Sequence, residues 1–146
     1  MAFKMTAAAD SWFQALSGAR GAFRNKFDLY YFCLMLGLKN AKRDELVNGK
    51  EFIDYFIADY HQHGRSIVSA VVLVEAKRLG VPLTNRHQIQ DLLRLFLNPA
   101  HVTGLSENGF RACNGYANHG FNCLNDVFAD KPRDSEVFVI KYLQQF

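Results

Sequence analysis

Apolar residues recur along this chain every three or four positions, which is the spacing of the buried face of an α-helix. The most apolar segment, residues 27–38, is apolar on nearly all sides, so we expect it to form a helix in the centre of the core. The same spacing predicts further helices at residues 6–17, 48–62, 66–79, 84–97, 106–128 and 134–146, with a strand as the alternative for the last segment. We therefore predict an all-α fold, a compact array of six to seven helices in a single domain over residues 1–146.

Residues that cap or end helices mark the predicted boundaries. Asn48, with Glu51 three residues later, resembles a capping box. Thr84 and Ser106 are expected to cap the helices that follow them. Gly80 directly follows a predicted helix, in a position where glycine commonly ends one.

Two glycines interrupt the long predicted helix at residues 106–128. Gly115 and Gly120 each disfavour a helix by about 1 kcal/mol relative to alanine. They predict either the close approach of another backbone or a break in the helix near Asn118. One face of the same segment carries a stripe of asparagines that is suited to hydrogen bonding with a partner: Asn114, Asn118, Asn122 and Asn125.

Positive charge is concentrated around the central apolar segment, although the net charge of the whole chain is only +3. The basic residues that flank this segment are Arg20, Arg24, Lys26, Lys39, Lys42 and Arg43. We expect them to emerge on one side of the molecule and to contact nucleic-acid phosphates, with binding that depends on salt more than on sequence. The alternative is that they are solvated helix ends, since lysine and arginine near a helix C-terminus offset its dipole. Residues 44–60 contain five acids and one lysine, which can pair with these cations or face a different partner.

Residues 66–97 show a weak helix-turn-helix pattern. Gly80 and Thr84 stand roughly where this motif has its turn glycine and the start of its second helix. In that arrangement Arg86 would reach DNA from the second helix. However, Pro82 lengthens the turn, and Arg86 occupies a position at which the motif usually has an apolar residue. A second group of basic residues lies on the same two predicted helices: Arg65, Lys77, Arg78, Arg86 and Arg94.

The cysteines and the N-terminus indicate where the protein resides. The three cysteines lie among apolar or small residues without a CxxC pair, as expected for reduced, buried thiols: Cys33, Cys113 and Cys123. The N-terminus has no signal-peptide pattern. The longest apolar run is about a dozen residues, which is shorter than the roughly 18 needed to span a bilayer. We therefore expect a cytoplasmic protein with no membrane partner.

Candidates for metal binding and for nucleophilic catalysis are few. His61 and His63 are two residues apart and would point away from each other on a helix. His119 and Cys123 are four residues apart and share a helix face, but a structural zinc site needs four ligands. Cys113 and His119 would lie about 9 Å apart along one helix, too far for a thiol–imidazole contact. The sequence has no GxSxG, HExxH, P-loop or dinucleotide-binding motif, so we predict no catalytic residue, metal, cofactor or small-molecule substrate.

The aromatic content of 14% favours an interaction surface in addition to a core. Tyrosine suits protein interfaces because one end of its side chain is apolar and the other is polar. We expect a non-enzymatic helical subunit or adaptor of a larger assembly, for example in a bacterial DNA-handling system, that contacts nucleic acid through its basic groups. The alternatives are a module that docks an acidic protein partner or a second copy of itself and, more remotely, an enzyme that uses a thiol or a metal.

Overall fold

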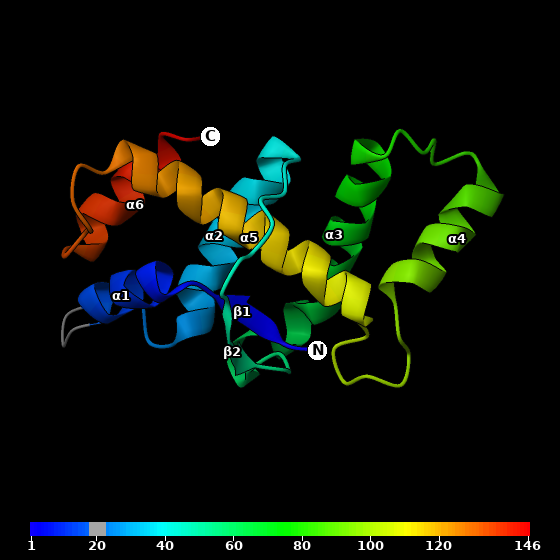
Figure 1. Cartoon of the computed structure of the whole chain (residues 1–146), viewed down its shortest axis with the longest axis horizontal. Helices are drawn as coiled ribbons and strands as arrows, with labels where there is room; N and C mark the ends of the chain where they lie inside the picture. Colours follow the sequence, from blue (N-terminus) through cyan, green and yellow to red (C-terminus); the bar gives the residue numbers. More distant parts are fainter. Residues whose placement is uncertain (18–22) are drawn as a thin grey trace.

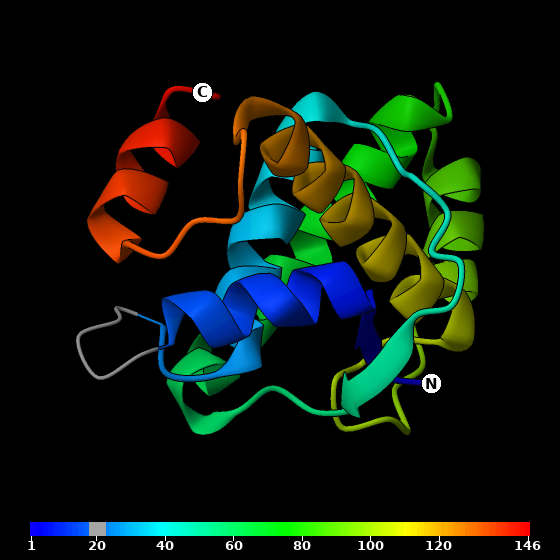
Figure 2. The same ribbon diagram turned by 60° about the vertical axis from the view of Figure 1, so that its left-hand side comes forward.

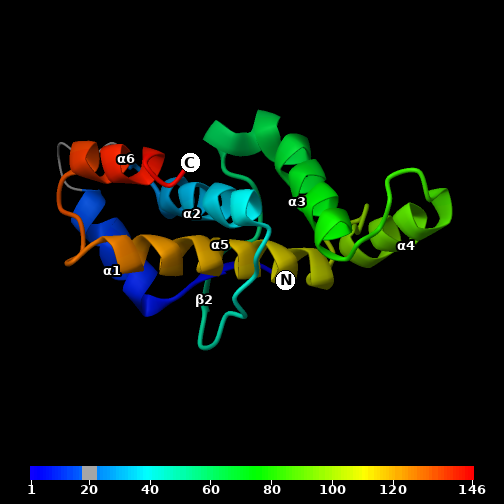
Figure 3. The same ribbon diagram turned by 90° about the horizontal axis from the view of Figure 1, so that it is seen from above.

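Two long helices, α2 (Lys26–Asn40) and α5 (Glu107–Val127), pack against each other and form the centre of the fold (Figure 1). The computed structural model describes residues 1–17 and 23–146, so Arg20 lies outside the described residues. The six α-helices in this part of the chain confirm the predicted all-α fold. The other four helices lie toward the two ends of the central pair (Figure 3): α1 (Ala7–Leu16) and α6 (Ser135–Leu143) at one end, and α3 (Gly64–Arg78) and α4 (Arg86–Phe96) at the other.

Glycines allow α2 and α5 to approach each other closely. A β-carbon on Gly37 of α2 would overlap the backbone carbonyl oxygen of Tyr116, and one on Gly120 of α5 would overlap that of Cys33. The absence of side chains at these two positions therefore lets the helix backbones touch. The close approach predicted from Gly120 is confirmed, whereas the alternative, a break near Asn118, is wrong because α5 runs without interruption.

The sequence pattern does not predict the small antiparallel sheet that joins β1 (Phe3–Met5) to β2 (Lys50–Ile53). The predicted helix at residues 48–62 is wrong, because this segment contains β2 and then a short 3-10 helix, η1 (Ala58–His63). Asn48 adopts a left-handed conformation with a φ of 59°, so it lies in a bend before β2 and does not cap a helix. The strand forms because β1 completes its backbone hydrogen bonds, and local periodicity cannot reveal such a distant partner.

Most other predicted helix boundaries agree with the structure. The side chains of Thr6 and Ser106 cap α1 and α5 by accepting hydrogen bonds from backbone N–H groups. Asn85, rather than Thr84, caps α4 in the same way. Gly80 follows α3 with a positive φ of 69°, a conformation that glycine adopts readily. The choice of a helix for the last segment of the chain is confirmed by α6.

Most of the aromatic rings fill the core. Tyr30 and Tyr116 are buried, and Phe3 of β1 packs edge-on against the rings of Phe27 and Phe110. Edge-on contacts of this kind add to the stabilisation that burial provides. In the described residues, no helix combines the length and the apolar surface that crossing a bilayer requires.

Candidate functional site

The basic residues expected to contact nucleic acid lie at the two ends of α2. Arg24 and Lys26 are at its N-terminal end, and Lys39, Lys42 and Arg43 are at its C-terminal end. A helix of 15 residues is about 22 Å long, so α2 itself holds the two groups apart. That the two groups emerge on one side of the molecule stays a prediction.

Several of these side chains have partners within the protein. Nζ of Lys26 lies 2.6 Å from Oδ1 of Asp10. Nζ of Lys39 donates a hydrogen bond of 2.9 Å to the backbone carbonyl oxygen of Gln145. Three candidates are exposed and form neither an ion pair nor a side-chain hydrogen bond within the described residues: Arg24, Lys42 and Arg86.

Arg43 belongs to a buried ion-pair network around Glu75 of α3. The Glu75 side chain is fully buried, and its carboxylate accepts hydrogen bonds from Arg78 at 3.0 and 3.1 Å and from Arg43 at 3.3 Å. The Tyr116 hydroxyl donates a further bond of 2.6 Å. Burial by itself would raise the pKa of Glu75, but the hydrogen bonds from Arg78 and Tyr116 hold this pKa below its ordinary value. Because Arg43 and Arg78 compensate a buried charge, the geometry favours a structural role for both.

Three asparagines of the predicted stripe on α5 bind other parts of this chain, and two of them hold segments against the helix. Asn114 accepts hydrogen bonds from the Tyr30 hydroxyl at 2.8 Å and from the backbone N–H of Lys4 at 2.9 Å. Asn118 donates to two backbone carbonyl oxygens of the segment that joins α2 to β2, which runs alongside α5 (Figure 2). These side chains fasten β1 and the connecting segment to α5, so their amides are occupied within the protein.

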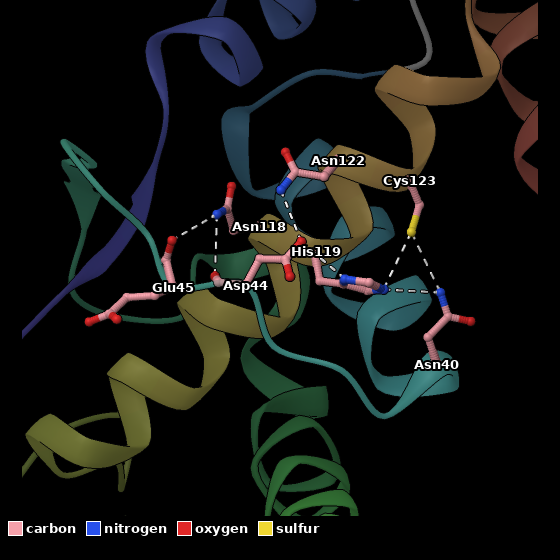
Figure 4. Close-up of polar contacts among 7 residues, drawn as sticks. All are labelled: Asn40, Asp44, Glu45, Asn118, His119, Asn122 and Cys123. Atoms are coloured by element: carbon pink, nitrogen blue, oxygen red, sulfur yellow. Dashed lines mark hydrogen bonds and ion pairs between the residues drawn. The ribbon is translucent and has the colours of Figure 1, made fainter.

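Asp44, His119 and Cys123 form a line of polar contacts where the segment after α2 meets α5 (Figure 4). Nδ1 of His119 lies 3.0 Å from Oδ2 of Asp44, and Nε2 of the same ring lies 3.4 Å from Sγ of Cys123. His119 and Cys123 are one helical turn apart on α5, so their contact follows from local spacing. Asp44 comes from a segment 75 residues earlier. It is held there because its backbone carbonyl oxygen accepts from Asn118 and its backbone N–H donates to Gly115.

Two further asparagine amides complete this site, which we call the thiol site. It consists of Asn40, Asp44, His119, Asn122 and Cys123. Nδ2 of Asn122 donates a hydrogen bond of 3.0 Å to the same Oδ2 of Asp44. Asn40, at the C-terminal end of α2, places its Nδ2 3.7 Å from Sγ of Cys123 and 3.5 Å from Nε2 of His119. Side chains from α2 and α5 therefore contact the sulfur atom, and the connecting segment reaches it through His119 (Figure 4).

The two ends of the thiol site differ in charge at neutral pH. The hydrogen bonds from Asn122 and His119 hold the pKa of Asp44 below its ordinary value, so its carboxyl group is ionised. Partial burial and the nearby carboxylates of Asp44 and Asp126 raise the pKa of Cys123, so its sulfur is protonated. The site is therefore a carboxylate, an imidazole and a thiol in sequence, an arrangement in which a base can activate a nucleophile.

The other residues considered for chemistry lie elsewhere. Cys113 is fully buried, which raises its pKa to about 12. It makes no hydrogen bond with His119 in the described part of the chain. His61 and His63 are exposed on η1. No group of three or more histidine, cysteine, aspartate or glutamate side chains within residues 1–17 and 23–146 is placed to hold a metal ion.

The α3–α4 arm, which we define as residues 64–104, exposes several large apolar side chains at the end of the molecule away from α6 (Figure 1). Leu83 and Val102 are the most exposed of them, at 67% and 76%. The arm also carries five basic residues and two acids, of which Glu75 is buried. The large exposed apolar residues of the arm are Leu73, Leu79, Leu83, Leu93, Leu95 and Val102.

The connection between α3 and α4 does not match a helix-turn-helix motif. Residues 79–85 separate the two helices, whereas the motif has a turn of about three or four residues.

Comparison of this chain with protein-family models, curated proteins and solved structures finds no match.

Proposed function

We propose that this protein is a helical subunit of a larger assembly and that the α3–α4 arm docks it to an acidic protein partner. One observation supports this proposal: the arm combines large exposed apolar side chains with an excess of positive charge. Single exposed apolar residues are common, but several on one part of a surface are typical of an interaction site. Cations such as Arg86 would favour a partner with acidic side chains, since complementary charge guides association and selects the partner.

Nucleic acid is the second candidate partner, because Arg24, Lys42 and Arg86 are exposed without ion pairs in the described residues. Phosphate contacts from these side chains would give salt-dependent binding with little sequence preference. However, two of them stand at opposite ends of α2, which does not favour one continuous phosphate-binding surface. The leucines of the arm also suit a protein surface better than a row of phosphates. A cytoplasmic location stays a prediction.

Two surface variants test the proposed docking surface. The arm variant carries Leu83→Ser, Leu95→Ser and Arg86→Glu, and the matched control carries Ile140→Ser and Leu143→Ser on exposed positions of α6. Tagged proteins are purified from the cells that naturally produce this chain, and copurifying proteins are quantified by mass spectrometry. We expect one stoichiometric acidic partner with the wild type and the α6 control, and its loss with the arm variant. Equal recovery with the arm variant, or no stoichiometric partner at all, would contradict the proposal.

Duplex DNA is the probe that separates the two classes of partner. Fluorescence anisotropy of a labelled duplex is measured at increasing salt with the wild type and with an Arg24→Glu, Lys42→Glu, Arg86→Glu triple variant. We expect no binding to DNA by the wild type even at low salt. If the wild type binds and the triple variant binds about tenfold or more weakly, the nucleic-acid alternative replaces the protein partner.

A further inference from the structure

We propose that Cys123 is a nucleophilic thiol that accepts an acyl group, with His119 as its base and Asp44 as the residue that positions this base. The substrate class is an activated carbonyl compound, such as a thioester. The thiol site lies where the C-terminal end of α2 meets α5 (Figure 4), and none of its residues belongs to the α3–α4 arm. Each proposal can therefore fail without the other.

His119 is held in the orientation that a base for Cys123 requires. Nδ1 faces Oδ2 of the ionised Asp44 at 3.0 Å, so the carboxylate accepts Nδ1–H and Nε2 remains available to receive a proton. Nε2 lies 3.4 Å from Sγ, within hydrogen-bonding distance for sulfur. Asn122 donates to the same carboxylate oxygen and so restrains Asp44 itself. A nucleophile, its base and a group that orients the base are the parts of a covalent catalytic site.

The surroundings of Cys123 make this base necessary. The carboxylates of Asp44 and Asp126 disfavour a thiolate, so the sulfur must lose its proton during the attack itself. Cys123 is also the cysteine that a reagent can reach, because its side chain is partly exposed while Cys33 and Cys113 are buried.

Asn40 supplies the feature that favours a carbonyl substrate. Its amide nitrogen lies 3.7 Å from Sγ of Cys123 and comes from a different helix than the thiol and the base. An N–H donor beside the sulfur can bind the carbonyl oxygen as negative charge develops on it during attack.

The acyl transfer balances without an external oxidant or reductant. Sγ of Cys123 attacks the carbonyl carbon of the donor thioester while the S–H proton moves to Nε2 of His119. The bond between this carbon and the donor sulfur then breaks, and the departing thiolate takes the proton from His119. The acyl group remains on Cys123 as a new thioester.

Phenyl thioacetate is a suitable probe, with intact-protein mass spectrometry and peptide mapping as the readout. We expect one acetyl group per chain, located on Cys123. His119→Gln is expected to slow the reaction about 100-fold or more, the size of effect that a positioned base supplies. His61→Gln is the matched control, because this exposed imidazole lies outside the site and its loss should leave the rate unchanged.

Two further variants separate positioning from general damage to the fold. Asp44→Asn should slow acetylation about tenfold or more, and Asp44→Glu should restore part of the rate because it returns the carboxylate. If His119→Gln does not fold, as judged by circular dichroism, Asn40→Ala takes its place and should slow acetylation about tenfold or more. Failure of Cys123 to become acetylated, equal rates in the wild type and His119→Gln, or oxidation by hydrogen peroxide without acetylation would each overturn the proposal.

Discussion

Replacement of Gly120 by alanine should destabilise the protein, because the added β-carbon has no space between α2 and α5. This atom would overlap the backbone carbonyl oxygen of Cys33, which cannot rotate away as a side chain can. Alanine favours a helix over glycine by about 1 kcal/mol, so the clash has to exceed this gain before any loss of stability appears. Overpacked cores typically lose about 1–3 kcal/mol. Because the obstacle is the backbone of the other central helix, we expect a net loss of about 2 kcal/mol in the free energy of unfolding.

Gly115→Ala is the matched control on the same helix. Its β-carbon would lie 3.1 Å from Nε and 3.2 Å from Cβ of Arg43, so this neighbour has to move by only a few tenths of an ångström, whereas at Gly120 the overlap is with a backbone oxygen atom. We expect its free energy of unfolding to stay within about 1 kcal/mol of the wild-type value. Urea denaturation followed by circular dichroism measures both variants. Wild-type or higher stability of the Gly120 variant would refute this reasoning, and so would equal losses for the two variants.

Three further predictions concern the buried polar groups. Tyr116→Phe removes the 2.6 Å hydrogen bond to Glu75 and should lower the free energy of unfolding by about 1–2 kcal/mol in the same urea assay; an unchanged value would contradict this. The pKa of Glu75 is lower in the folded protein than its ordinary value of 4.5, so its stabilising contribution is complete above that value and disappears as the pH falls through the folded pKa. As the pH falls from about 6 to about 3, thermal unfolding should therefore show a larger loss of stability in the wild type than in Tyr116→Phe. Equal losses in the two proteins would contradict the role of the ion-pair network around Glu75. Iodoacetamide should alkylate Cys123 but neither buried thiol in the native protein, since burial raises the pKa of Cys113 to about 12 and also raises that of Cys33. Peptide mapping that finds either buried thiol alkylated before unfolding would contradict this assignment.

Local sequence signals predict most of the helices because these signals act between residues that are close in the chain. Apolar residues three or four positions apart form one face, and a cap such as Ser106 binds an N–H group only three residues away. The segment at residues 48–62 is the exception. Its aromatic spacing suits a helix, but pairing with β1 at the start of the chain makes part of it a strand.

The sequence likewise predicts the local contacts of the candidate sites and misses the contacts between distant segments. The spacing of His119 and Cys123 predicts a shared helix face, and the structure shows them in contact. No feature of the sequence connects Asp44 to this pair, because their contact depends on how the segment after α2 lies against α5. Arg43 appears in the sequence as one of several free cations, whereas the structure places it against the buried carboxylate of Glu75.

By itself the sequence determined the helical class of this protein, the central position of its most apolar segment and the length of α5. Only the tertiary structure decided which glycines allow close packing, which cations are neutralised and which carboxylate faces His119. The physical reason is the distance along the chain over which each kind of interaction acts. Helix formation is settled by hydrogen bonds and side-chain contacts within a few residues, whereas charged and polar groups are satisfied by partners that folding brings from distant parts of the chain.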